Sequence, residues 1–472
     1  MHALLSDLEW PPVEGAAVAL LCDLLRMDTT NPPGEERACA ELVAEHLRGS
    51  GLEPRLLEAV PGRANVVARL RGSGEQPPLL LTAHLDVVAA AAERWTHPPF
   101  GGTVAGGQIW GRGAVDMKAM AAMSLMVLRL LAELGVRPNR DVLFAGVADE
   151  EAGCEHGSAW LVDHHPETVR AGYSLGEVGG FTLHVGGRAI YPIQVAEKGV
   201  CWFTARVRGT SGHGSVPRED NCVVALAELI ATLGRRRLPV HAAPAVQRFV
   251  RGIAATQGPP TARALEAVLN PRLSGLVTST VIRDRGVARQ LQALVRNTVS
   301  PTVLRAGEKI NVIPAAAEAE LDGRVALGSS AEELLEEVRA LLPRRLRSVI
   351  ELEVTRARAP HEAPADTPLF ATLAAVVEEH HPGAVAVPSV IPGFTDAHHF
   401  SRLGTVCYGF APLRLGPEDP AFAELFHADD ERVPVAGYRA GLRMLADAVF
   451  RFVAPAEASP RSRPGVSSPD NV

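Results

Sequence analysis

The sequence predicts an α/β protein in which a mostly parallel sheet carries an inserted α+β domain. Short apolar runs such as Leu79–Ala83 and Val142–Val147 alternate with amphipathic helices, as in parallel strands covered on both faces. A later region has the order strand, helix, strand, strand, helix, strand, which is that of a ferredoxin-like sandwich. The length of 472 residues is too great for one core and favours two or three domains.

The first part of the chain supplies the main sheet and its covering helices. Its expected helices are Glu14–Met27, a second one ending at Gly49, one with Met120, Met123 and Val127 on its apolar face, and Ser158–His164. Its expected strands are Asn65–Leu70, Leu79–His84, Val142–Val147 and Tyr173–Gly176. The helices are recognised by apolar faces at helical spacing, and the strands by short apolar runs.

The sandwich-like region is expected to be an insertion between two halves of the first fold. Its strands are predicted at Cys201–Val207, Lys309–Pro314, Ala317–Leu327 and Ile350–Arg356, and its helices at Val223–Leu233 and Ala331–Leu342. We therefore expect residues 1–197 to form the first part of the main domain, 198–358 the insertion, 359–453 the second part, and 454–472 a disordered tail rich in Pro, Ser and Arg. Residues 235–302 make the insertion longer than a minimal sandwich.

Composition excludes several classes of partner and location. The net charge of −7 and the absence of a basic patch argue against nucleic acid or an anionic membrane as partner. The six cysteines form no CxxC pair, so free thiols in a reducing compartment are expected. Asp7 and Glu9 precede the first apolar run, and Asp23 interrupts it, so neither a signal peptide nor a membrane span is predicted. We expect a cytoplasmic protein.

Metal-capable side chains follow three predicted strands. His84 and Asp86 come at the end of the first, Asp149–Glu151 after the second, and Glu177 after the third. Taken alone, a histidine or an acidic turn is usually a solvated surface group. The carboxyl ends of strands in an open α/β sheet meet at one crevice, so the repetition favours one shared site.

These residues stand within motifs that resemble a known family. The motifs are Ala83–Val88, Trp95–Gly102, Trp110–Lys118 and Asp149–Gly153. In order and spacing they are similar to the di-zinc family of aminoacylases, acetylornithine deacetylase, succinyl-diaminopimelate desuccinylase and carboxypeptidases. The enlarged insertion resembles the Gly-X carboxypeptidase branch. The resemblance implies a zinc-hydrolase catalytic domain whose inserted ferredoxin-like domain is a lid and dimerisation domain.

The resemblance implies two Zn²⁺ ions held by five residues, with Co²⁺ or Mn²⁺ as possible substitutes. The implied ligands are His84, Asp116, Glu151, Glu177 and His427. Asp116 would bridge the ions, His84 and Glu177 would complete one, and Glu151 and His427 the other. Asp86 would orient His84, and a cis peptide bond is expected after Asp116. Glu150 would be the general base that takes the proton of a metal-bridging water.

The resemblance also implies substrate contacts from the lid. His213 would stabilise the oxyanion at a partner subunit's site, while Asn311, Arg324 and Gly393 would hold the substrate's carboxylate. The predicted function is hydrolysis of the amide bond of small peptides or N-acyl amino acids by a homodimer joined through the lid. Two alternatives remain open: a deacylase or desuccinylase of a biosynthetic N-acyl amino acid, and a non-catalytic dimeric binding protein on the same fold.

Overall fold

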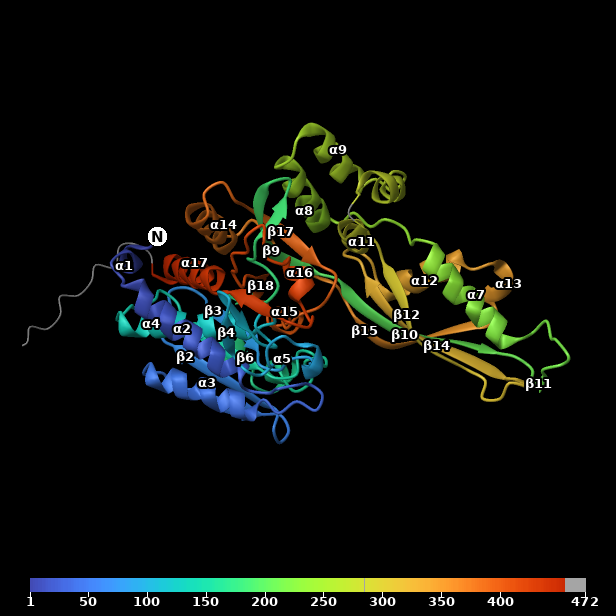
Figure 1. Cartoon of the computed structure of the whole chain (residues 1–472), viewed down its shortest axis with the longest axis horizontal. Coiled ribbons are helices and arrows are strands. Elements are labelled where there is room, and N and C mark those ends of the chain that lie inside the picture. The colour runs from blue at the N-terminus through green and yellow to red at the C-terminus, as the bar shows by residue number, and fades with distance from the viewer. Residues whose placement is uncertain (284, 455–472) are drawn as a thin grey trace, which may run out of the picture. The chain divides into compact units, whose positions relative to one another are not determined.

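The computed structural model describes residues 1–283 and 285–454, and these form two compact units (Figure 1). The first unit contains Met1–Tyr173, Ala371–His380 and the chain from His427 onward. The second contains Ser174–Phe370 and His381–Phe426. The predicted tail, residues 454–472, lies outside the described residues except for Ala454.

The main sheet of the first unit places the ends of two strands at one edge. Its strands pair in the order β1-β2-β6-β3. Their bounds are Arg55–Glu58 for β1, Ala64–Leu70 for β2, Val142–Val147 for β6 and Leu79–His84 for β3. β3 and β6 are parallel, with His84 opposite Val147. Every residue of β3 and β6 is buried, which explains their continuous apolar sequence. Because the strands end together, the segments that follow them meet.

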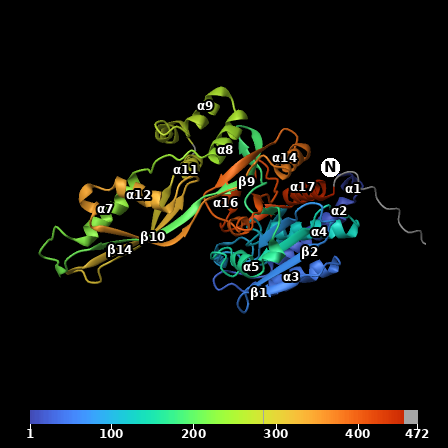
Figure 2. The ribbon, with the colours of Figure 1, turned by 180° about the vertical axis from the view of Figure 1, so that it is seen from behind.

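Helices pack against this sheet. α3 packs along β2, and Figure 2 shows it beside β1 and β2. α4 packs on β3 and β6 and is covered in turn by α2 and α17. The helices of this unit are α1 Ala3–Ser6, α2 Trp10–Leu25, α3 Arg37–Gly49, α4 Lys118–Glu133, α5 Ser158–His164, α6 Pro166–Val169, α14 Pro368–His380 and α17 Val435–Val453, with a 3-10 turn η1 at Ala92–Arg94. A small sheet has the order β19-β5-β4, formed by Arg432–Pro434, Gln108–Trp110 and Thr103–Ala105.

The second unit contains a sheet centred on β9, Arg188–Glu197. β8 (Leu183–Val185), β16 (His361–Glu362) and β18 (Val406–Gly409) pair with it antiparallel, and β17 (Val385–Ile391) pairs with it parallel. β7, Tyr173–Gly176, precedes Glu177. Residues 235–302, which lengthen the insertion, contribute α8 Pro244–Ala255, which packs on β17. They also contribute α9 Pro259–Ala267, α10 Ser274–Leu276, the π-helical turn η2 Val277–Val281 and α11 Arg285–Leu294.

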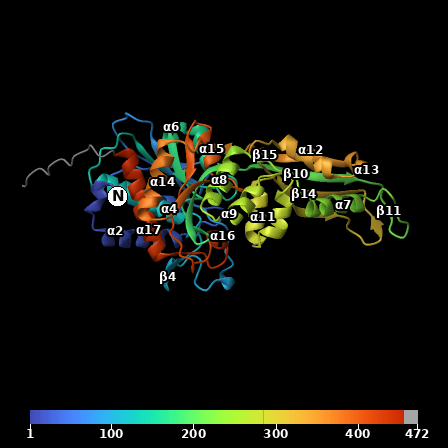
Figure 3. The ribbon, with the colours of Figure 1, turned by 90° about the horizontal axis from the view of Figure 1, so that it is seen from above.

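The lid is an antiparallel sheet of order β12-β14-β10-β15, with α7 and α12 packed on it. The strands are β10 Gly199–Arg208, β12 Thr298–Ala306, β14 Ala316–Val325 and β15 Ile350–Arg358, and the helices are α7 Cys222–Arg235, α12 Ala331–Leu341 and α13 Arg344–Arg347. Phe203, Leu226, Leu321 and Val338 belong to its buried core. The hairpin of β11 (Gly212–His213) and β13 (Val312–Ile313) forms the tip of the lid (Figures 1 and 3).

One predicted lid strand is wrong. The sequence predicts Lys309–Pro314 as the strand beside Ala317–Leu327, but β12, Thr298–Ala306, pairs with β14 instead. β12 is an edge strand, largely exposed, and its register shifts near Pro301. Proline is tolerated at sheet edges and irregularities, and such a strand lacks the alternating pattern on which the prediction depends. Of the predicted segment only Val312–Ile313 is a strand, in β13.

The predicted fold class is confirmed. An α/β fold with a mixed central sheet carries an inserted antiparallel sheet with ferredoxin-like strand order. The boundaries at residues 197/198 and 358/359 stay predictions. Within the part of the chain that the structure describes, no helix combines the length and apolar character needed to cross a bilayer.

Candidate metal centre

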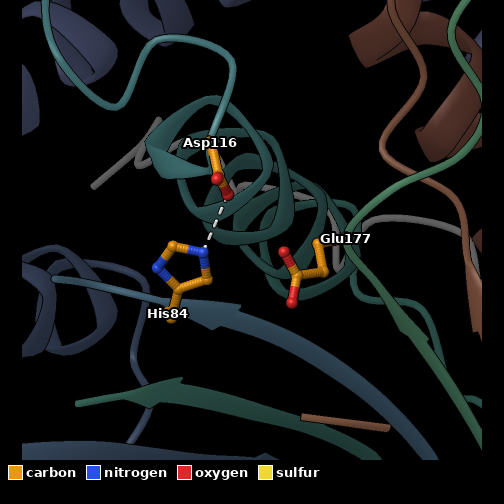
Figure 4. Close-up of side chains that lie close together, drawn as sticks. All are labelled: His84, Asp116 and Glu177. Atoms are coloured by element: carbon orange, nitrogen blue, oxygen red, sulfur yellow. Dashed lines mark hydrogen bonds and ion pairs between the residues drawn. The ribbon is translucent and has the colours of Figure 1, made fainter. Parts of the chain in front are cut away.

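His84 is the last residue of β3 and is fully buried. Its Nδ1 lies 3.0 Å from the backbone oxygen of Asp86, and its Nε2 lies 2.9 Å from Oδ1 of Asp116, the bond drawn in Figure 4. A backbone oxygen at Nδ1 favours the tautomer with the proton on that nitrogen. Nε2 is then the nitrogen that can bind a metal ion.

Asp116 lies between two imidazoles. Its Oδ1 is 2.9 Å from Nε2 of His84, and its Oδ2 is 2.9 Å from Nε2 of His427. Burial alone would raise the pKa of Asp116, but the two histidines hold it well below its usual value. The peptide bond from Asp116 to Met117 is cis, as the resemblance implies. A carboxylate with an imidazole at each oxygen has the arrangement expected of a ligand shared by two ions.

Glu431 holds the loop that carries Asp116. It is buried, and its carboxylate accepts hydrogen bonds from the backbone N–H groups of Gly113, Val115 and Asp116 at 3.0, 2.6 and 3.1 Å. The guanidinium of Arg112 donates to it at 2.6 Å. Gly113 adopts φ +90, a conformation that favours glycine. Glu431 was not identified by the sequence analysis.

The turn after β6 is fixed by Asp86. The backbone N–H groups of Glu150 and Glu151 each donate to its carboxylate at 3.1 Å. The same carboxylate is 3.6 Å from Nδ1 of His84, farther than the backbone oxygen of Asp86. The orienting role of Asp86 toward His84 stays a prediction; the nearer of these two contacts with Nδ1 is the main-chain oxygen of Asp86. Its side chain instead positions the two glutamates.

A buried network behind this turn was missed by sequence reasoning. The amide of Asn31 donates to Asp86 at 2.9 Å and to Asp149 at 3.1 Å. Arg63 forms ion pairs with Asp149 and Glu36, both at 2.8 Å. Asp149 has a φ of +69, an uncommon conformation for a residue other than glycine that is often found at functional sites. The network therefore braces the acidic turn from two earlier segments of the chain.

Two groups of possible ligands lie within the first unit. One is His84, Glu150 and Glu151, and the other is Asp116, Glu151 and His427; within each group the ligand atoms lie within 4.8 Å of one another. His427 has φ +59, and its Nε2 is 3.1 Å from Oε1 of Glu151. Burial alone would lower the pKa of His427, but its contacts with Asp116 and Glu151 raise it to about 10. The imidazole thus sits in a strongly negative environment that favours a cation.

The donor set fits zinc. Imidazole nitrogens and carboxylate oxygens are the ligands that Zn²⁺ takes in catalytic sites, and a concentration of buried carboxylates is costly unless cations balance it. Glu177, the fifth predicted ligand, follows β7 in the second unit and is 7% exposed.

The substrate-binding residues predicted in the lid do not lie together within one chain. His213 pairs with Val312, and the N–H of Gly214 donates to the oxygen of Asn311 at 2.9 Å, so His213 and Asn311 share the lid tip. Arg324 lies eight residues beyond Ala316 along β14, roughly 26 Å at 3.3 Å per residue. It makes a two-pronged ion pair with Asp322, at 2.7 and 3.0 Å.

Gly393 lies in the loop between β17 and α15, Ala397–Ser401. A Cβ atom at Gly393 would have no heavy atom within 4 Å. The space beside its backbone is therefore open.

The fold and the buried donor set define a metal-dependent enzyme of the α/β class. The chain belongs to the peptidase family M20/M25/M40, whose model matches residues 80–451. It is therefore a metallo-hydrolase of that family, and the predicted family resemblance is confirmed.

Two relatives agree with this assignment, and a solved structure shares the fold. The chain is 29% identical over 385 residues to the human N-fatty-acyl-amino acid synthase/hydrolase PM20D1, covering 79% of this chain and 73% of that protein. It is 28% identical over 443 residues to pig (Sus scrofa) aminoacylase-1, covering 91% and 93%. The crystal structure of the M20 family metallo-carboxypeptidase Sso-CP2 from Sulfolobus solfataricus has a TM-score of 0.67 at 17% identity, covering 92% and 98%.

Proposed function

We propose that this chain is a di-zinc hydrolase that cleaves the amide bond of N-acyl amino acids or small peptides with a free carboxylate. The observation that carries the proposal is the position of Asp116, whose two carboxylate oxygens each lie 2.9 Å from an imidazole, one from β3 and one from residue 427. Co²⁺ and Mn²⁺ suit the same donors. The names of the two relatives, an N-fatty-acyl-amino acid synthase/hydrolase and an aminoacylase, support an N-acyl amino acid as substrate.

In this proposal Asp116 would hold both ions. His84 and Glu177 would complete one site, and Glu151 and His427 would complete the other. When bound, the ions would polarise the amide carbonyl and lower the pKa of a water molecule. Asp86 and Asn31 keep Glu150 and Glu151 in place through the hydrogen bonds described above.

Glu150 is assigned as the general base. It is 7% exposed, and its main chain is fixed by Asp86, so its carboxylate is held beside the proposed ligands. It would take a proton from the attacking water and later donate one to the departing amine. Removing a general base typically costs about 10²- to 10⁴-fold in rate.

Kinetics and metal analysis on Glu150→Gln test this assignment. We expect that large loss of kcat for N-acyl amino acid hydrolysis, with metal content equal to that of the wild type. Glu155→Gln, an exposed acid five residues along the same segment, is the matched control and should keep full activity. Full activity in Glu150→Gln would refute the role, and loss of metal in that variant would make Glu150 a ligand instead.

We also propose a homodimer in which His213 and Asn311 serve the partner's site. They are separated from Arg324 along β14, so one chain's lid does not offer all three groups to one substrate. The lid tip also exposes Val216, Ile310 and Val312, an apolar group that a second copy would cover. His213 would stabilise the oxyanion there, while Arg324 would exchange Asp322 for a substrate carboxylate, with Gly393 supplying backbone.

Complementation between inactive variants tests the dimer. Glu150→Gln and His213→Ala chains, each inactive alone, should regain up to about half of wild-type activity per site in heterodimers, because one of the two sites is then complete. No recovery in verified heterodimers would refute the shared site.

A further inference from the structure

A polar cluster in the second unit has no part in the proposed chemistry. Its centre is His399 on α15, which is 6% exposed. Among the described residues, neither ring nitrogen of His399 has a hydrogen-bond partner. Buried side-chain nitrogens are nearly always paired, so two unpaired ones on a single imidazole indicate a missing ligand.

Three separate segments converge around this histidine. The loop before α15 is tied to β9 by Thr395, whose N–H and hydroxyl donate to Glu197 at 3.0 and 2.8 Å. His361 on β16 lies opposite the same Glu197 in the antiparallel register of β16 and β9. Arg358, the last residue of β15, places its guanidinium 4.9 Å from the centroid of the Phe394 ring. β15, β16 and the loop therefore bring their side chains to one place.

The cluster combines the guanidinium of Arg358 with neutral imidazoles. His398 packs edge-on against His399 at 5.2 Å between ring centroids. Burial lowers the pKa of His399 to about 3, with the charge of Arg358 as the next cause. Burial, followed by the same guanidinium, lowers the pKa of His398 to about 4. Neutral imidazoles beside a guanidinium can donate N–H groups without adding charge. Nε2 of His361 is a further buried nitrogen without a partner among the described residues.

We propose that Arg358, His361 and His399 form an anion-binding subsite for a second carboxylate of the substrate. The guanidinium fork pairs well with a carboxylate, and the two imidazoles supply N–H donors around it. The proposal rests on the proposed function in one respect: Gly393, at the open start of the same loop, is assigned to the substrate's α-carboxylate. His399, six residues after Gly393, would then contact the side chain of the substrate amino acid whose α-carboxylate lies at Gly393. The subsite selects acidic amino acids.

Binding of L-glutamate and L-glutamine to the purified enzyme tests the subsite without any turnover, because neither carries an acyl group to remove. The two differ only in the side chain, which ends in a carboxylate in glutamate and in an amide in glutamine. Calorimetry should give about tenfold tighter binding of glutamate, as expected when charged hydrogen bonds replace neutral ones. Arg358→Gln should abolish the preference. Arg345→Gln is the matched control, since it removes an exposed arginine that pairs with Glu228 in the same unit, and it should keep the preference.

Two further variants cover the case in which Arg358→Gln does not fold. Arg358→Lys keeps the charge but loses the fork, and His399→Gln removes an imidazole; each should reduce the preference at least about threefold. Equal binding of glutamate and glutamine by the wild type would overturn the proposal, and so would a preference that survives in all folded variants. If glutamate is preferred but N-acetylglutamate is not hydrolysed, the subsite stands and the proposed function fails.

Discussion

Replacing Glu431 by glutamine is expected to weaken the metal centre without removing any ligand. The carboxylate accepts three backbone N–H groups and the buried guanidinium of Arg112. Arg112 is 2% exposed, so the variant leaves a buried charge unpaired. Breaking a buried ion pair in this way costs about 3–5 kcal/mol. Because Glu431 holds the main chain of Asp116, metal affinity should also fall by about 10- to 100-fold, as for other groups that position ligands.

Chelator competition for metal affinity and guanidinium unfolding measure the two effects. Glu424→Gln, an exposed glutamate on α16 (Phe422–Leu425), is the control and should change neither. A double-mutant cycle with Arg112→Met should show a coupling of about 1–3 kcal/mol. If Glu431→Gln binds metal as tightly as the wild type, Glu431 does not position Asp116 and the account of this loop is wrong.

Three further predictions concern stability and the network behind the site. Hydrogen bonds from His380 and Arg451 overcome burial and lower the pKa of Asp447 to about 2. The ionised carboxylate of Asp447 therefore contributes roughly 2 kcal/mol to the free energy of unfolding. This contribution is present above about pH 4 and is lost as the pH falls through 2. The acid unfolding of Asp447→Asn should lack this contribution. Gly157→Ala would drive a Cβ into the backbone oxygen of Ala148, so soluble yield and melting temperature should fall sharply, and a normal melting curve would contradict this. Asn31→Ala should lower both kcat and metal content, because Asp86 and Asp149 lose the amide that donates to each of them. Unchanged kcat and metal content would refute a bracing role for Asn31.

The sequence was sufficient to predict the candidate ligands that directly follow a strand. His84 and the acids at 149–151 follow fully apolar runs, and β3 and β6 lie in register as parallel strands, so their convergence follows from the pattern. The lid's strand order was likewise predictable from the succession of elements. The edge strand β12 was not, because its exposed residues and Pro301 give no alternating pattern.

The supporting residues were less accessible to sequence reasoning. Asn31, Arg63 and Glu431 act through side-chain hydrogen bonds to segments 55, 86 and 315 residues away, and no local periodicity reports such contacts. The separation of Asn311 from Arg324 could not be predicted either, because it depends on the strand register of the lid.

The number of metal ions bound per chain tests the central claim most directly. Elemental analysis and calorimetric titration of the purified protein should give two Zn²⁺ per chain for the wild type, one for His427→Ala, and a severe loss at both sites for Asp116→Asn. Two ions retained by Asp116→Asn, or no more than one bound by the wild type, would contradict the shared role of Asp116.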